Sequence, residues 1–165
     1  MGVRKAQVGD APTIHALVNA CAREELMLPL SRSEVYDRLR DFFVYEREGE
    51  VVGCVALHVV WEDLAEVRSL AVRDDARGAG VGRELVAACL AEAPGLGVRR
   101  VFTLTFVPGF FRKLGLAETS KEALPHKVWA DCVRCPHFPN CEEVALVGEV
   151  GPGGELRGPG AGGEG

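Results

Sequence analysis

The chain has 165 residues, of which 47% are hydrophobic and 26% are charged, and its formal net charge is −5. This length and composition are typical of one globular domain with a buried core, and the acidic balance argues against nucleic acid as a partner. No stretch approaches the roughly 18 apolar residues of a membrane-spanning helix, so no membrane partner is expected. The first residues, MGVRKAQVGD, contain no apolar signal region, which predicts a cytoplasmic protein with reduced cysteines.

The N-terminal part predicts one short strand and two helices. Residues 3–6 (VRKA) have a strand pattern, and Asp10 is the expected N-cap of the helix that follows. Ser31 and Glu34 have the spacing of a capping box at the start of the second helix. The apolar positions expected to face the core are Ile14, Leu17, Val18 and Cys21 in the first helix, and Val35 and Leu39 in the second.

The central part predicts three strands, a glycine-rich loop and a helix. Two strands flank a turn at Gly49 in FFVYEREGEVVGCVALHVV, and a third covers residues 65–73. After the loop, a helix is expected from about 81 to 92, where Pro94 and Gly95 follow and stop it. Its apolar face consists of Leu85, Val86, Cys89 and Leu90.

The C-terminal part predicts a buried strand over 98–107, a short helix in PGFFRKLGL that ends at Gly115, and a last strand over 143–150. The predicted class is therefore α/β (α+β), with a mixed, mostly antiparallel sheet flanked by helices, over residues 1–150. The remaining segment, GPGGELRGPGAGGEG (151–165), has too few apolar residues to offset the entropy of ordering and is expected to be a disordered tail.

The loop between Arg73 and Val81 has the composition of an anion site. Gly78 and Gly80 can adopt positive φ and let another molecule approach the backbone closely. Successive N–H groups and the N-terminus of the next helix attract an anion, and Arg77 adds a cation. A diphosphate is the expected ligand; the alternative is a tight strand-to-helix turn without a ligand.

The surrounding sequence limits which diphosphate-containing ligand the loop is expected to bind. No Gly-Lys-Ser/Thr follows, which disfavours a nucleoside triphosphate with magnesium, and the strand RVFTLTF lacks the acidic end residue that binds a ribose in dinucleotide sites. The pattern RGAGVG after RSLAV, with FFRKLGL further on, resembles the GNAT acetyltransferase superfamily. The resemblance implies a GNAT-like acyl-CoA N-acyltransferase fold and acetyl-CoA as cosubstrate. It places the pyrophosphate on Arg77, Gly78, Ala79, Gly80, Val81 and Gly82.

The same resemblance implies contacts on either side of the loop. The backbone of Leu70, Ala71 and Val72 is expected to bond the pantetheine arm. Phe111 stands at the cofactor position where the family usually has a tyrosine, often the general acid that protonates the leaving thiolate. A phenyl ring has no proton to donate, so the acid is expected to be Ser69, a thiol or water.

A narrower resemblance concerns the acceptor. The segments VRKAQVGDAPTIHALV, LMLPLSRSEVYDRLRDFFVYEREGEVVGCVALH, LAEVRSLAV and LPHKVWADC follow the order of the acetyltransferase domain of N-acetylglutamate synthases, and the similarity to their short bacterial forms covers about residues 3–149. It implies transfer of acetyl to the α-amine of L-glutamate, for arginine biosynthesis. The alternatives are a GNAT enzyme for another small amine, glutamine or a protein terminus, and a non-catalytic acyl-CoA-binding or metal-sensing module.

Glutamate transfer requires a base for the ammonium group and cations for two carboxylates. Glu66 stands on the strand where the family has a glutamate and is the expected base; the alternative is a solvated residue paired with Arg68. Arg32 and Lys127 match basic positions near the family's acceptor pocket, with surface cations as the alternative. Relatives tend to carry an arginine where this chain has Leu30. The residue that contacts the α-carboxylate of glutamate in the family is therefore not carried over directly to this position.

The segment DCVRCPHFPNC has a metal-ligand spacing. Cys132, Cys135 and Cys141, with His137 or His126, could form a structural zinc site. The alternative is a proline-braced loop with buried thiols or a redox pair, and thioester chemistry needs no metal in either case.

The other cysteines, Cys21, Cys54 and Cys89, follow apolar patterns and are expected in the core. His15 and His58 are expected to be structural. A homodimer is compatible with the sequence, which does not determine the oligomeric state.

Overall fold

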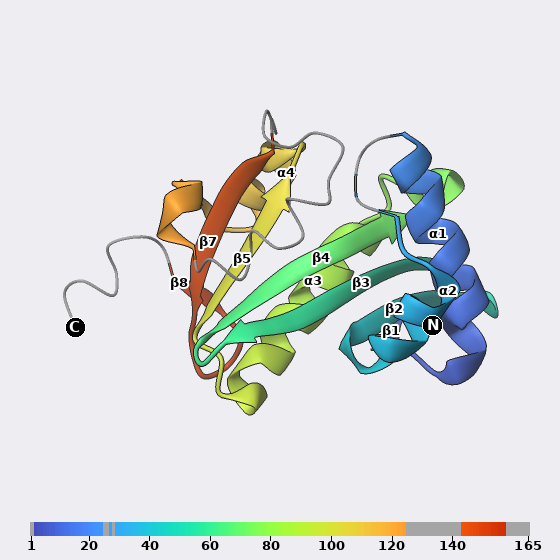
Figure 1. The fold of residues 1–165 in the computed structure, drawn as a ribbon, viewed down its shortest axis with the longest axis horizontal. Coiled ribbons are helices and arrows are strands. Elements are labelled where there is room, and N and C mark those ends of the chain that lie inside the picture. The colour runs from blue at the N-terminus through green and yellow to red at the C-terminus, as the bar shows by residue number, and fades with distance from the viewer. Residues whose placement is uncertain (1, 25–26, 28, 125–142, 158–165) are drawn as a thin grey trace. The chain divides into compact units, whose positions relative to one another are not determined.

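The computed structural model describes residues 2–24, 27, 29–124 and 143–157 (Figure 1). The chain divides into two compact units, Met1–His58 with Val67–Cys89 and Val59–Glu66 with Leu90–Gly165. Within the described ranges, no helix combines the length and the apolar character needed to cross a membrane.

The first unit is built on four strands in the order β1 (Gly2–Lys5), β2 (Phe42–Arg47), β3 (Glu50–Trp61) and β4 (Leu64–Val72), of which the last two continue into the second unit. β1 and β2 pair antiparallel, as do β2 and β3. The turn between β2 and β3 has positive φ at Glu48 (53°) and Gly49 (79°), which confirms the turn predicted at this glycine.

The first unit also holds α1 (Ala11–Arg23), α2 (Arg32–Asp37) and the start of α3 (Val81–Glu92). The predicted capping box of α2 is confirmed, because the amide of Glu34 donates to Ser31 Oγ (3.1 Å) and the amide of Ser31 donates to Glu34 Oε1 (3.3 Å). These reciprocal bonds satisfy N–H groups that a helix start otherwise leaves without a partner.

Asp10 stands at the predicted N-cap position of α1, but its side chain makes no capping bond to this helix. A short 3-10 turn, Val8–Asp10, precedes α1 and gives Asp10 a helical backbone (φ −83°, ψ −14°) instead of the extended one that a capping residue needs. The Asp10 carboxylate instead accepts bonds from the amide of Gln7 (2.8 Å) and from the guanidinium of Arg4 (2.8 and 3.0 Å). The bond from Arg4 holds the pKa of Asp10 below its usual value.

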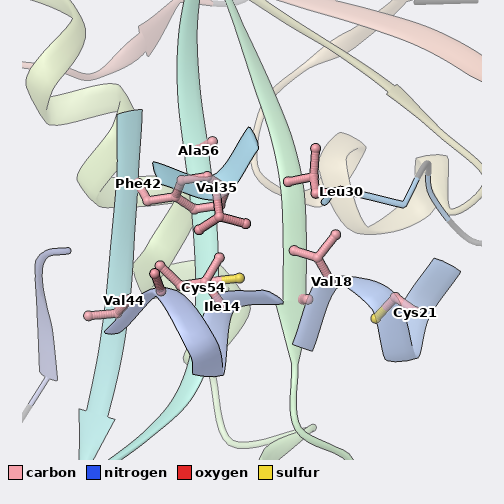
Figure 2. Packing of buried hydrophobic residues seen from close by; sticks show 11 residues of the cluster. Ile14, Val18, Cys21, Leu30, Val35, Phe42, Val44, Cys54 and Ala56 are labelled. Atoms are coloured by element: carbon pink, nitrogen blue, oxygen red, sulfur yellow. The ribbon is translucent and has the colours of Figure 1, made fainter. Parts of the chain in front are cut away.

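The predicted apolar stripes of α1 and α2 lie on one face of the first unit's strands. Figure 2 shows Ile14, Val18 and Val35 gathered with side chains of β2 and β3. The cysteines expected in the core are buried free thiols, and burial raises the pKa of Cys54 to about 12. The buried members of this cluster are Ala11, Ile14, Val18, Cys21, Leu30, Val35, Phe42, Val44, Cys54, Ala56 and Ala71.

The second unit contains the only parallel pair that the described strands show, residues 64–66 of β4 against 100–102 of β5 (Arg100–Thr105). β7 (Val144–Val150) pairs antiparallel with β5, with β6 (Ala117–Thr119) and with β8 (Leu156–Arg157). α4 (Pro108–Lys113) follows β5. The mixed, mostly antiparallel class predicted from the sequence is confirmed; the strand of β6 has only three residues and was not predicted.

The start of the segment predicted to be a disordered tail is folded. Leu156–Arg157 forms β8 on β7, and the amide of Gly151 donates to the carbonyl of Glu155 (2.8 Å). Gly154 has a φ of 85°, and a Cβ there would lie 2.7 Å from Ala91 Cα, so glycine alone fits this turn. Glycines that were expected to be disordered therefore form a close-packed hairpin. Residues 158–165, the rest of the predicted tail, lie outside the described residues.

Candidate functional site

The strand that leads to the glycine-rich loop contains an unusual backbone conformation. Ser69 has a φ of 56°, a left-handed value that costs a residue with a Cβ about 1–2 kcal/mol. The thiol of Cys54 lies 3.6 Å from the Ser69 carbonyl oxygen and donates to it. This departure from the regular pleat comes directly before Leu70, Ala71 and Val72, the residues predicted to bond a pantetheine arm, and no glycine in the sequence signalled it.

The chain is anchored to the strands where β4 ends. The amide of Arg73 donates to the carbonyl of Val52 on β3 (2.8 Å), and the side chain of Ala76 is buried. The guanidinium of Arg73 also pairs with Asp75 (2.6 Å) and Glu50 (3.1 Å), but these exposed pairs contribute little to stability. The backbone bond and the buried alanine therefore determine where the loop begins.

Arg77 lies between this anchor and the glycines. Its Nε donates to the Val72 carbonyl (3.2 Å), and its NH2 group lies 3.3 Å from Asp74 Oδ1. Its positive charge also acts on Cys21, at the end of α1, where it opposes the rise in the thiol pKa that burial causes. A guanidinium has five N–H donors, so these contacts orient Arg77 and leave donors for an anion.

The loop itself has the backbone that the sequence predicts. Gly78 and Gly80 both have a φ of 83°, and a Cβ at either position would meet no atom within 4 Å. Glycine is required here by conformation and not by crowding. α3 starts at Val81, and the first amide to bond back is that of Glu84, to the Gly80 carbonyl (3.1 Å).

The start of α3 and the loop border a shallow, open hollow of about 430 Å³. The first amides of a helix have no acceptor within it and give this end a partial positive charge. Arg83 lines the hollow, and so does Glu84, whose bond with the Tyr45 hydroxyl raises the pKa of that tyrosine. The hollow is lined by Gly78, Ala79, Gly80, Arg83 and Glu84. Its donors suit an anionic group of diphosphate size.

Glu66 and Phe111 belong to the second unit. Glu66 is half-buried in β4, opposite Phe102 of β5 in the parallel pair. Phe111 is only 4% exposed and meets the ring of Phe110 edge-on, with centroids 5.0 Å apart. Phe111 therefore packs in the interior of its unit and offers no exchangeable proton.

Of the two residues predicted to bind the acceptor, the structure describes Arg32 but not Lys127. Arg32 is the first residue of α2, is exposed, and its side chain makes no hydrogen bond or ion pair to another described residue. Leu30, the position at which the family resemblance suggested an arginine, is buried among α1 and α2 residues. Lys127 lies outside the described residues, as do the zinc candidates Cys132, Cys135, Cys141 and His137 and the histidine at position 126. In the ranges that the structure describes, no group of three or more His, Cys, Asp or Glu side chains could hold a metal.

One polar pair escaped the sequence analysis. His58 on β3 and Asp41, just before β2, are joined through Nδ1 and Oδ2 at 2.8 Å, and both are half-exposed. The register Phe42↔Ala56 brings their backbones together. Only the strand register connects these residues, so the sequence offered no local signal.

Comparisons with known proteins agree with this geometry. A sequence profile of the acetyltransferase (GNAT) family matches residues 12–116. An N-acetyltransferase of Chlorobaculum tepidum that is itself uncharacterized is 41% identical over 145 residues, which are 88% of this chain and 94% of the relative. The amino-acid acetyltransferase of Mycobacterium tuberculosis is 36% identical over 135 residues, covering 80% of this chain and 77% of the relative.

Two solved structures extend the likeness to three dimensions. The N-acetylglutamate synthase of Neisseria gonorrhoeae, complexed with coenzyme A and N-acetyl-glutamate, matches 90% of this chain with a TM-score of 0.83 and 28% identity. The match covers 35% of the synthase chain, so this chain spans about a third of its length. A Mycobacterium tuberculosis protein in complex with CoA has a TM-score of 0.77 and 32% identity, over 88% of this chain and 96% of that one.

Proposed function

The chain belongs to the acetyltransferase (GNAT) family and is an N-acetyltransferase, and from this premise we propose that it transfers the acetyl group of acetyl-CoA to the α-amine of L-glutamate. The observation that carries the proposal is the loop Arg77–Gly82, because its two left-handed glycines lead directly into the N-terminus of α3. Relatives named amino-acid acetyltransferase, and a structural neighbour bound to N-acetyl-glutamate, support glutamate as the acceptor.

In this proposal the loop holds the diphosphate of acetyl-CoA. The amides of Val81 and Gly82 have no acceptor within α3 and donate to its oxygens, while Arg77 compensates its charge. Preorganised backbone donors lose no side-chain entropy on binding, which makes the loop a rigid support for the cofactor. Leu70 to Val72 bond the pantetheine arm through the backbone, as the family resemblance implies.

Glu66 acts as the base that removes a proton from the glutamate ammonium group. The neutral amine then attacks the thioester carbonyl carbon, a C–N bond forms, and the C–S bond breaks. As the C–S bond breaks, the attacking nitrogen loses its second proton to solvent. The leaving thiolate takes up one proton, which Ser69 or water supplies because Phe111 has none to give, and this donor regains a proton from solvent. The products are N-acetylglutamate, CoA and the proton held by Glu66, which returns to solvent.

Arg32 and Lys127 bind the two carboxylates of glutamate. A guanidinium pairs with a carboxylate in a bidentate manner, which sets orientation as well as affinity. The exposed guanidinium of Arg32 has no partner among the described residues, so binding breaks no ion pair seen in that part of the chain. No zinc is included in this reaction, since thioester aminolysis does not need one.

The test is a release assay for the free thiol of CoA with purified protein, acetyl-CoA and separate acceptors: glutamate, glutamine, aspartate, other amino acids and a peptide with a free terminus. We expect glutamate to give the highest kcat/KM. A higher kcat/KM with glutamine or a peptide would show that glutamate is not the preferred acceptor and would leave the assignment of acetyl-CoA intact. Tight CoA binding without turnover of any acceptor would favour a binding module and contradict the proposed reaction.

A further inference from the structure

Asn19 connects α1 to the segment that enters α2. Its Nδ2 group donates to the carbonyl of His15, one turn back in α1 (2.8 Å), and to the carbonyl of Leu30, just before α2 (2.9 Å). A primary amide has two N–H donors, so these two bonds use both of them. One side chain therefore fixes the start of α2 against α1.

The bond to Leu30 is one of three constraints on this short stretch. The side chain of Leu30 is 6% exposed and packs in the cluster that contains Ile14, Val18 and Val35. The next residue, Ser31, forms the capping box that starts α2. Packing, cap and the Asn19 bond together determine the backbone position of the residue that follows, Arg32.

We propose that Asn19 is a positioning residue for the acceptor amino acid, acting through Arg32. The inference rests on the proposed function, in which Arg32 binds an acceptor carboxylate. The side chain of Arg32 makes no hydrogen bond or ion pair to another described residue, so among these residues it is the position of its own backbone that sets where its guanidinium can reach. The side chain of Leu30 is buried, and its carbonyl is the one to which Asn19 donates.

Two substitutions remove the connection in different ways. Asn19→Asp keeps the shape but replaces two donors by a carboxylate, which repels both carbonyl oxygens. Asn19→Ser adds no charge; its hydroxyl can still bond the carbonyl one turn back but is too short to reach Leu30. Ala20→Asp is the matched control, because it adds the same charge at the neighbouring, exposed position of α1.

The experiment measures KM for glutamate, KM for acetyl-CoA and kcat for each folded variant and for wild type. We expect Asn19→Asp and Asn19→Ser to raise the KM for glutamate about tenfold, as for loss of a bond that leaves a half-buried carbonyl without a donor. The KM for acetyl-CoA should stay within about twofold, and Ala20→Asp should match wild type. In an Arg32→Ala background, Asn19→Ser should have little further effect on the KM for glutamate, because the two changes remove one interaction.

The outcomes separate this inference from the proposal it rests on. Absence of glutamate turnover in the wild-type protein overturns the proposed function, and this inference with it. Wild-type turnover with an unchanged KM for glutamate in Asn19→Ser overturns the inference alone. Equal rises in both KM values, or an undiminished effect of Asn19→Ser in the Arg32→Ala background, assign Asn19 a general structural role and also overturn it. If Asn19→Asp does not fold, Asn19→Ser decides the matter.

Discussion

The glycine loop and the α1–α2 segment are both in the first unit, yet they are two different kinds of binding region. The loop uses consecutive backbone groups from Arg77 to Gly82, and its shape follows from glycines at the positions with positive φ. The α1–α2 segment presents one side chain, Arg32, whose position depends on Asn19, on packing and on a cap. A backbone site can therefore be predicted from a short stretch of sequence, whereas a side-chain site depends on contacts between distant residues.

The largest expected effect is on the chemical step, and it should leave the two binding regions unchanged. Glu66→Gln should lower kcat by roughly 10²–10⁴, the range for loss of a general base, while both KM values change little. Steady-state rates from pH 6 to 9 provide the measurement, and Glu62→Gln, an exposed glutamate before β4, is the control. A rate within twofold of wild type across this range would remove Glu66 from the mechanism.

A change confined to the loop should affect the binding of acetyl-CoA and not that of glutamate. Gly80→Val places a β-branched residue at a φ of 83°, and we expect the KM for acetyl-CoA to rise about tenfold or more as the backbone leaves that conformation. The KM for glutamate should stay near its wild-type value. Gly95→Val is the control, because this glycine is exposed and has open space around a Cβ without a positive φ. Calorimetry that shows unchanged CoA affinity in Gly80→Val would refute the diphosphate assignment.

The reverse pattern is expected on the acceptor side. Arg32→Ala should raise the KM for glutamate about tenfold or more, the loss expected for a hydrogen bond to a charged group, and leave the KM for acetyl-CoA unchanged. Arg23→Ala, an exposed arginine in the last turn of α1, controls for the loss of positive charge. If both substitutions gave the same KM for glutamate, Arg32 would be a surface cation and the contrast between the two regions would lose its acceptor side.

The smallest effect concerns stability and asks whether the backbone-defined site extends back into β4. At the left-handed φ of Ser69, Gly avoids the strain that any Cβ causes, so Ser69→Gly should be more stable than Ser69→Ala by about 1 kcal/mol. Equilibrium urea unfolding of the two variants measures the difference. An alanine variant as stable as the glycine variant would mean that residue 69 is extended in solution.

The same contrast separates the features that can be predicted from the sequence from those that cannot. The turn at Gly49, the Ser31–Glu34 cap and the glycine loop were predicted because local residues determine each of them. The failures are tertiary in origin. Asp10 turned to Arg4 and Gln7 because a 3-10 turn precedes α1, and Leu156 joined β7 although its surroundings are rich in glycine.

Within the site, the glycine motif and the flanking periodicity predict the loop. They predict neither the conformation of Ser69 nor the bond from Asn19 to Leu30. The left-handed φ of Ser69 has no sequence signature, because this conformation is usual for Gly and occasional for Asn or Asp, not for Ser. The Asn19 bond spans eleven residues and depends on how α1 packs beside the start of α2. Both features belong to the three-dimensional structure, and both concern how the two binding regions are held in place.

The most direct test is a titration of ¹⁵N-labelled protein with CoA, followed at the backbone amides. The account predicts that the amides of Gly78 to Gly82 show the largest shifts and saturate together, because their N–H groups bind the diphosphate, while those of Ser31 and Arg32 change little. Saturable CoA binding with no shift at Gly78 to Gly82 would contradict the assignment of the cofactor to this loop.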